Sequence, residues 1–188
     1  MATKQKSDNH WLRNSVIRTT HWHFILVTFL MGQIILYDAS KLITPEVVMQ
    51  RWLVTTLLLA TAAAVWFLAR SKITNSTLFY MSLTFALIIV DIIVASFNVY
   101  TQRGMASRAV LLFAIPIIVS AILMSRVALF TTALLCIAAY TATAVSYFVL
   151  NFNEGYKVEL YGEIGFYSLT LLLFAGLLWV VIRGKHKR

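Results

Sequence analysis

Asp91 is the residue of this sequence whose surroundings most call for a chemical explanation. It lies inside the apolar run Thr77–Tyr100 and is the only acidic residue well within such a run. Nine residues separate it from Tyr100, which is about 13 Å along a helix, so it falls near the middle of a hydrocarbon layer about 30 Å thick. An ionisable group at that depth is a candidate ligand contact, proton site or conformational switch. The alternative is a neutral or paired aspartate that holds helices together.

Asp91 belongs to a polar stripe on one helix face. Residues seven apart share a face of a helix, and four polar residues have this spacing: Thr77, Thr84, Asp91 and Asn98. The partner of Asp91 stays open. Arg51, Arg103 or Arg108 could reach toward it, or hydroxyl groups of other segments could bond its protonated form. Tyr100 and Arg103, which follow the stripe, are further candidate ligand contacts.

A second polar stripe lies near the C-terminal third of the chain. Its members recur at intervals of three and four, which places them on one side of a helix: Thr132, Cys136, Tyr140, Thr143 and Tyr147. This stripe could line a pocket with Asp91, or it could be packing with satisfied hydroxyls. We take Tyr140, Thr143 and Tyr147 as candidate site residues.

Pro116 interrupts another apolar run, within Ile115-Pro116-Ile117. Inside a helix a proline removes one backbone hydrogen bond, and here it would leave the carbonyl of Leu112 free. Membrane helices tolerate this when neighbouring groups bond the freed carbonyl. The sequence therefore predicts a kink, either a hinge or a purely structural bend.

Other chemistries have little support. His21 and His23 are two residues apart, so they point in different directions on a helix and suggest no metal site. The single cysteine, Cys136, excludes an intrachain disulfide and fits apolar packing. The sequence contains no phosphate-binding glycine loop, zinc motif or nucleophile elbow. We predict no catalytic residue, metal or cofactor, and hence no enzyme.

The composition identifies the class of protein that holds these residues. The 188 residues are 60% hydrophobic and 12% charged, about half the charge of an average soluble domain. So few charged residues cannot cover a soluble fold, and the many aromatic residues argue against disorder. The sequence predicts an all-α polytopic membrane protein, a single domain of six transmembrane helices. These spans are expected at 16–37, 48–69, 77–100, 109–124, 127–150 and 164–182.

The net charge of +9 is explained by membrane topology, so no nucleic-acid partner is predicted. With six spans, eleven Lys and Arg residues lie on the side of both termini and five on the other side. The richer side is expected to be cytoplasmic, which places both termini inside a plasma (inner) membrane. Tryptophans near the predicted span ends suit the headgroup region of the bilayer: Trp11, Trp22, Trp52, Trp66 and Trp179.

The stretch from Asp91 to Ile118, DIIVASFNVYTQRGMASRAVLLFAIPII, resembles the N-terminal membrane sensor module of bacterial sensor histidine kinases. Asp91, Tyr100, Gly104, Ser107 and the Ile-Pro-Ile element occur in the order of that pattern. The chain departs from it at Gln102–Gly104, where a Gly-Gly pair is common, and at Ser107–Ala109, where Ser-Pro-Phe is common. The resemblance implies a sensory input module that signals through its last helix, as a homodimer or to a cytoplasmic partner. No kinase domain follows in this chain.

Two other functions remain open on the sequence alone. Six spans in about 190 residues also fit a substrate-binding subunit of a membrane transporter. The Ala-x-x-x-Ala docking element of vitamin-importer subunits is nevertheless missing from Val16–Tyr37. A structural subunit without a ligand is the third possibility, with the Asp91 stripe joining helices.

Overall fold

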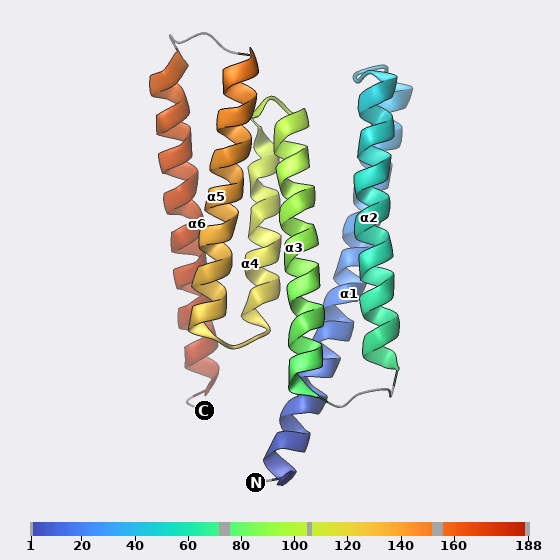
Figure 1. Cartoon of the computed structure of the whole chain (residues 1–188), viewed down its shortest axis with the longest axis vertical. Coiled ribbons are helices and arrows are strands. Elements are labelled where there is room, and N and C mark those ends of the chain that lie inside the picture. Colours follow the sequence, from blue (N-terminus) through green and yellow to red (C-terminus); the bar gives the residue numbers. More distant parts are fainter. Residues whose placement is uncertain (1, 72–75, 105–106, 152–155, 187–188) are drawn as a thin grey trace. The chain divides into compact units, whose positions relative to one another are not determined.

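The computed structural model describes residues 2–71, 76–104, 107–151 and 156–186. Every regular element in these ranges is helical, which confirms the predicted all-α class (Figure 1). In chain order the elements are α1 (Ala2–Ala39), α2 (Pro45–Arg70), α3 (Thr77–Thr101), the 3-10 helix η2 (Arg108–Phe113), α4 (Ala114–Ala121), α5 (Arg126–Asn151) and α6 (Lys157–His186).

Five helices of the described part are long and apolar enough to cross a membrane. These segments are His10–Ala39, Pro45–Arg70, Thr77–Thr101, Arg126–Asn151 and Lys157–Arg183. The sequence predicted one more continuous span over 109–124. The structure instead divides this region between η2 and α4, which form a shorter apolar segment, Arg108–Ala121.

Pro116 explains where the 3-10 helix gives way to an α-helix. It is the third residue of α4, and as a proline it has no N–H to donate to a carbonyl of the preceding 3-10 turn. The carbonyl of Leu112, which we expected to be free, accepts the backbone N–H of Ala114. The proline therefore lies next to a change of helix type, and the kink expected there stays a prediction.

The chain divides into two compact units, Met1–Val90 and Asp91–Arg188, with the boundary inside α3. In the first unit α1 packs against α2. Arg13, near the start of α1, donates from its Nε to the carbonyl of Ala69 (2.9 Å) and from its Nη2 to that of Arg70 (3.2 Å). The two helices are therefore antiparallel, and Arg13 bonds carbonyls that the end of α2 leaves unpaired.

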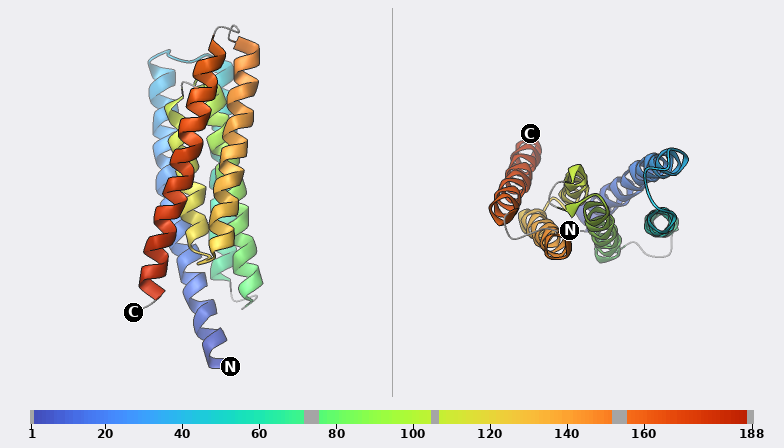
Figure 2. Two further views of the ribbon diagram at one scale, coloured as in Figure 1. Left: turned by 90° about the vertical axis from the view of Figure 1, so that its left-hand side faces the viewer. Right: turned by 90° about the horizontal axis from the view of Figure 1, so that it is seen from above.

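The second unit packs several helical segments around one core. Contacts join α5 to α6, and α4 to α5, α6 and η2; α6 lies along α5 and is inclined to it (Figure 2). Phe113, Ile117, Leu129, Tyr140 and Ala175 are fully buried in this core. The core therefore surrounds the face of α5 that carries the second polar stripe.

Candidate functional site

The inward face of α3 carries three buried polar side chains. Thr84, Asp91 and Asn98 are only 1%, 4% and 7% exposed, in agreement with the shared face predicted from their spacing. Thr84 donates to the carbonyl of Tyr80 (2.9 Å) and Asn98 to that of Val94 (2.9 Å), both on the same helix. Thr84 and Asn98 thus each make one hydrogen bond within α3. Asp91 cannot do the same as a carboxylate, because a carboxylate has no hydrogen to donate to a helix carbonyl.

Asp91 interacts electrostatically with Cys136 of α5. The Cys136 side chain is fully buried, and its thiol is a weak donor and weak acceptor. The carboxyl of α3 and the buried thiol of α5 therefore lie within electrostatic range of each other. Among the described residues no three His, Cys, Asp or Glu side chains are placed to hold a metal ion.

Tyr140 lies one helical turn beyond Cys136 and is also fully buried. Its ring packs edge-on against Phe113 (6.3 Å between centroids) and against Tyr167 of α6 (5.5 Å). Its phenol interacts electrostatically with Tyr167 and Glu163, yet the oxygen has no hydrogen-bond partner within the described ranges. A polar cluster thus extends from Asp91 through α5 to α6.

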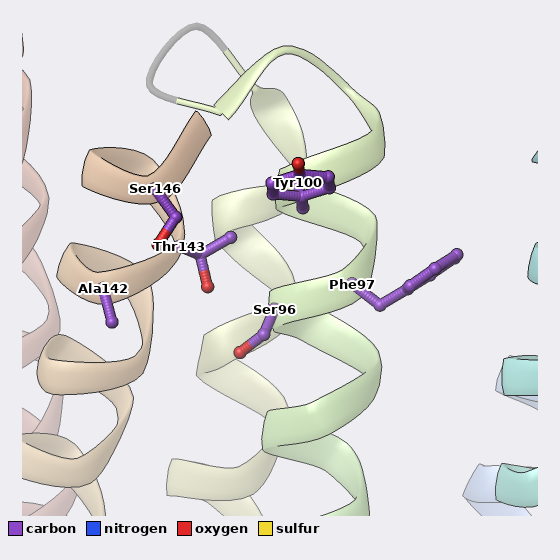
Figure 3. Close-up of a pocket in the computed structure, with 6 residues that line it drawn as sticks. All are labelled: Ser96, Phe97, Tyr100, Ala142, Thr143 and Ser146. Carbon is purple, nitrogen blue, oxygen red and sulfur yellow. The ribbon is translucent and has the colours of Figure 1, made fainter. Parts of the chain in front are cut away.

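A groove of about 350 Å³ lies between α3 and α5 in the second unit. Figure 3 shows Ser96 and Thr143 in the space between the two helices. The Thr143 hydroxyl donates to the carbonyl of Ala139 (2.7 Å) and can still accept. The groove combines hydroxyl groups with apolar surface, and its lining residues are Ser96, Phe97, Tyr100, Ala142, Thr143 and Ser146.

Tyr100, which lines the groove, takes part in a close contact between the end of α3 and α5. Tyr100 packs edge-on against Tyr147 of α5, with 5.6 Å between ring centroids. Gly104 has a φ of +60°, and a Cβ there would lie only 2.7 Å from the Cβ of Tyr147. The backbone of the turn after α3 therefore approaches α5 closely, which only a glycine permits.

The predicted site residues separate into groups. Tyr100 and Thr143 line the groove, and Tyr147 packs beside it. Asn98 and Pro116 are buried outside the lining, and Arg103 is exposed in the turn after α3. Thr84 belongs to the first unit and is not a groove residue. The largest predicted set, the α5 stripe, is thus divided between the groove and the core.

Sequence reasoning missed four residues of this region. Ser96 and Ser146 line the groove, and Glu163 and Tyr167 of α6 face Tyr140. Ser96 is four residues before Tyr100, and Ser146 is three residues after Thr143, so helical spacing could have added both serines to the candidates. No comparable signal connects α6 with α5.

Comparison with protein families, curated proteins and solved structures finds no match for the chain. Functional inference therefore rests on this geometry. The groove presents hydroxyl groups and aromatic surface on one side of the α3–α5 pair. In the same unit Asp91, Cys136 and Tyr140 are buried polar side chains, whose surroundings a change in helix packing would alter.

Proposed function

We propose that this chain is a membrane sensory module that passes a signal from the second unit through its last helix. The groove between α3 and α5 is the proposed ligand contact, and Asp91 is the proposed switch residue. The observation that carries this proposal is the burial of Asp91 (4% exposed) beside the Cys136 thiol within a helix long enough to span a membrane. A carboxyl buried at this depth is a candidate switch, because its charge state and its contacts depend on how the surrounding helices pack.

The contacts of the second unit support a route to the last helix. A ligand that binds one separation of α3 and α5 better than another would shift the equilibrium between them. Tyr140 of α5 packs on Tyr167 of α6. A movement of α5 would therefore displace the α6 side chain that it contacts. The proposed receiver is a second copy of the chain or a cytoplasmic signalling protein at the end of α6.

Six crossings with both termini cytoplasmic are part of this proposal. The shortest segment, Arg108–Ala121, contains six 3-10 residues and eight α-helical residues. A 3-10 helix rises about 2.0 Å per residue and an α-helix about 1.5 Å, so the segment reaches about 24 Å. That length approaches the hydrocarbon thickness of about 30 Å. A reporter fused after Arg188 tests this topology, and an external location of the reporter would contradict it.

A structural subunit without a ligand is the competing function with a specific observation in its favour. Thr84 and Asn98 both donate to carbonyls of their own helix, as expected of polar residues that only stabilise α3. In that case Asp91 would serve helix packing and carry no signal.

The test is a substitution of Asp91 in the full chain with a two-state cytoplasmic reporter attached after Arg188. We expect Asp91→Leu to change reporter output per molecule by about threefold or more, because it removes the switch group. Membrane insertion and protein level should stay normal. Asp91→Asn keeps the size of the side chain and one acceptor oxygen, and should have a smaller effect. The matched control is Asp38→Leu, which removes an exposed carboxylate at the end of α1.

The outcomes separate the two functions. If Asp91→Leu leaves output per molecule unchanged, Asp91 is not the switch. If the same variant only lowers the amount of folded protein, the structural role is supported and the sensory proposal fails.

A further inference from the structure

The α1–α2 pair of the first unit buries a cation with no obvious counter-charge. Arg51 is only 5% exposed, and its Nε has no hydrogen-bond partner among the described residues. The guanidinium carbon lies 5.4 Å from the centroid of the Tyr37 ring on α1. A ring face attracts a cation but does not neutralise its charge. A buried arginine is normally paired with an acid or another acceptor.

Tyr37 brings a second donor to the same place. Gln33 donates from its Nε2 to the phenol oxygen of Tyr37 (3.1 Å), which leaves the phenol hydrogen available to donate elsewhere. A guanidinium and a phenol hydrogen side by side form a donor set suited to an oxyanion.

The acidic residues closest to Arg51 in sequence do not supply the missing charge. Asp38 and Glu46 are both exposed, where water and salt screen them. Helix α2 begins at Pro45, and its N-cap residue Thr44 makes no side-chain cap bond. The positive end of the α2 dipole and the unpaired N–H groups of its first turn therefore lie at the same end of α2 as Arg51.

The position of Arg51 along α2 indicates headgroup depth. Arg51 is the seventh residue of α2, about 9 Å from the helix start, and Trp52 beside it is half-buried. Tryptophan favours the membrane–water interface, and an arginine near a helix end extends toward that level. Lipid phosphate groups occupy this level.

We propose that Arg51, with the Tyr37 hydroxyl, binds a phosphate oxyanion. The site lies where α1 ends and α2 begins. An anionic phospholipid headgroup supplies this chemistry within the membrane, and free inorganic phosphate supplies it from the aqueous side. The site is separate from the groove of the second unit, so its test does not depend on the proposed sensory function.

The experiment uses the purified full chain in dodecyl maltoside. Its Tm is measured with phosphatidylglycerol, with diacylglycerol of the same acyl chains, and with inorganic phosphate, and lipid adducts are counted by native mass spectrometry. We expect phosphatidylglycerol to raise the Tm and to form an adduct that diacylglycerol does not. Arg51→Met should weaken phosphatidylglycerol binding about tenfold, because it removes the charge-assisted donors. Arg108→Met, which removes an exposed arginine, should bind as the parent chain does.

Each outcome decides the proposal. A Tm rise with phosphatidylglycerol alone, lost in Arg51→Met, assigns the site to a lipid. A rise with inorganic phosphate, lost in the same variant, assigns it to the free anion. Equal responses of Arg51→Met and the parent chain, or no response of the parent chain to either compound, would overturn the site. Arg51→Met replaces an uncompensated charge by an unbranched apolar side chain, so without ligand it should fold at least as well. Should it not fold, Tyr37→Phe keeps the charge and should weaken binding by about threefold; unchanged binding there would also overturn the site.

Discussion

Among the described residues each unit buries one side chain of the Asp, Glu, Lys and Arg types, and the two lie at different positions along their helices. Arg51 lies within two turns of the start of α2, in a unit built on the α1–α2 pair. Asp91 lies in the middle of α3, is buried, and interacts electrostatically with Cys136 of α5 in the second unit. A long arginine near a helix end can extend toward the interface, whereas a short aspartate at mid-helix cannot.

The two positions call for different surroundings. Near the start of α2 the Arg51 side chain can extend toward headgroups or an external anion. A mid-helix carboxyl needs neighbours on more sides, and α5 supplies Cys136 there. The first unit is therefore suited to contact the bilayer, and the second to hold a buried polar cluster whose environment can change.

Substituting one glycine in each unit by alanine should give the largest difference in unfolding free energy between the units. Gly104→Ala should destabilise the second unit by about 2–4 kcal/mol. The positive φ is strained for alanine, and the new Cβ would lie 2.7 Å from that of Tyr147, which forces repacking. Unfolding in mixed micelles of sodium dodecyl sulfate and dodecyl maltoside measures the change.

Gly32→Ala is the matched control in the first unit. No atom lies within 4 Å of a Cβ added at Gly32, which is inside α1, so the change should stabilise the chain by about 0.5–1 kcal/mol. Equal effects of the two substitutions would show that the turn after α3 does not approach α5 as described.

A smaller loss of stability is expected when a contact between α1 and α2 is removed. Arg13→Ala removes both bonds to the carbonyls of Ala69 and Arg70, and should cost about 1–2 kcal/mol because those carbonyls lose a charged donor. The same micelle unfolding assay measures it. Arg18→Ala, which removes an exposed arginine of α1, should change stability by less than about 0.5 kcal/mol. A loss as large as that of Arg13→Ala would point to a general charge effect.

The sequence predicted most helices closely because long apolar runs alone specify membrane helices. The expected span 77–100 became α3, Thr77–Thr101, and 127–150 became α5, Arg126–Asn151. Helix α1 begins at Ala2, well before the expected start at Val16, because hydropathy measures the apolar part of a helix and not its full length. The 3-10 helix η2 was missed because its composition is that of an α-helix.

The candidate site was predictable only within single helices. Periodicity placed Asp91 and Asn98 on one face of α3, and Tyr140 and Thr143 on neighbouring positions of α5. Which face of α5 meets which face of α3 or α6 is decided by tertiary packing, which one sequence does not specify. The contact of Tyr140 with Tyr167, and the groove at Ser96, could not be predicted for this reason.

The smallest change in stability is expected when one tyrosine hydroxyl in each unit is removed. The buried hydroxyl of Tyr140 has no hydrogen-bond partner within the described residues, whereas that of Tyr37 accepts a bond from Gln33. Removing an unpaired buried hydroxyl relieves its desolvation cost, so Tyr140→Phe should stabilise the chain by about 0.5–1 kcal/mol. Tyr37→Phe should destabilise it by a similar amount, because a made bond is lost.

Unfolding of both single variants and of the double variant, in the same micelles, measures the change in unfolding free energy. The two single variants should change it in opposite directions. The two sites lie on different units, so their effects should add. A loss of stability in Tyr140→Phe would mean that the hydroxyl bonds a group such as the Glu163 carboxylate, which already interacts with it electrostatically. In that case the polar cluster of the second unit would be joined to α6 by a hydrogen bond, and the coupling between α5 and α6 would be stronger than ring packing alone provides.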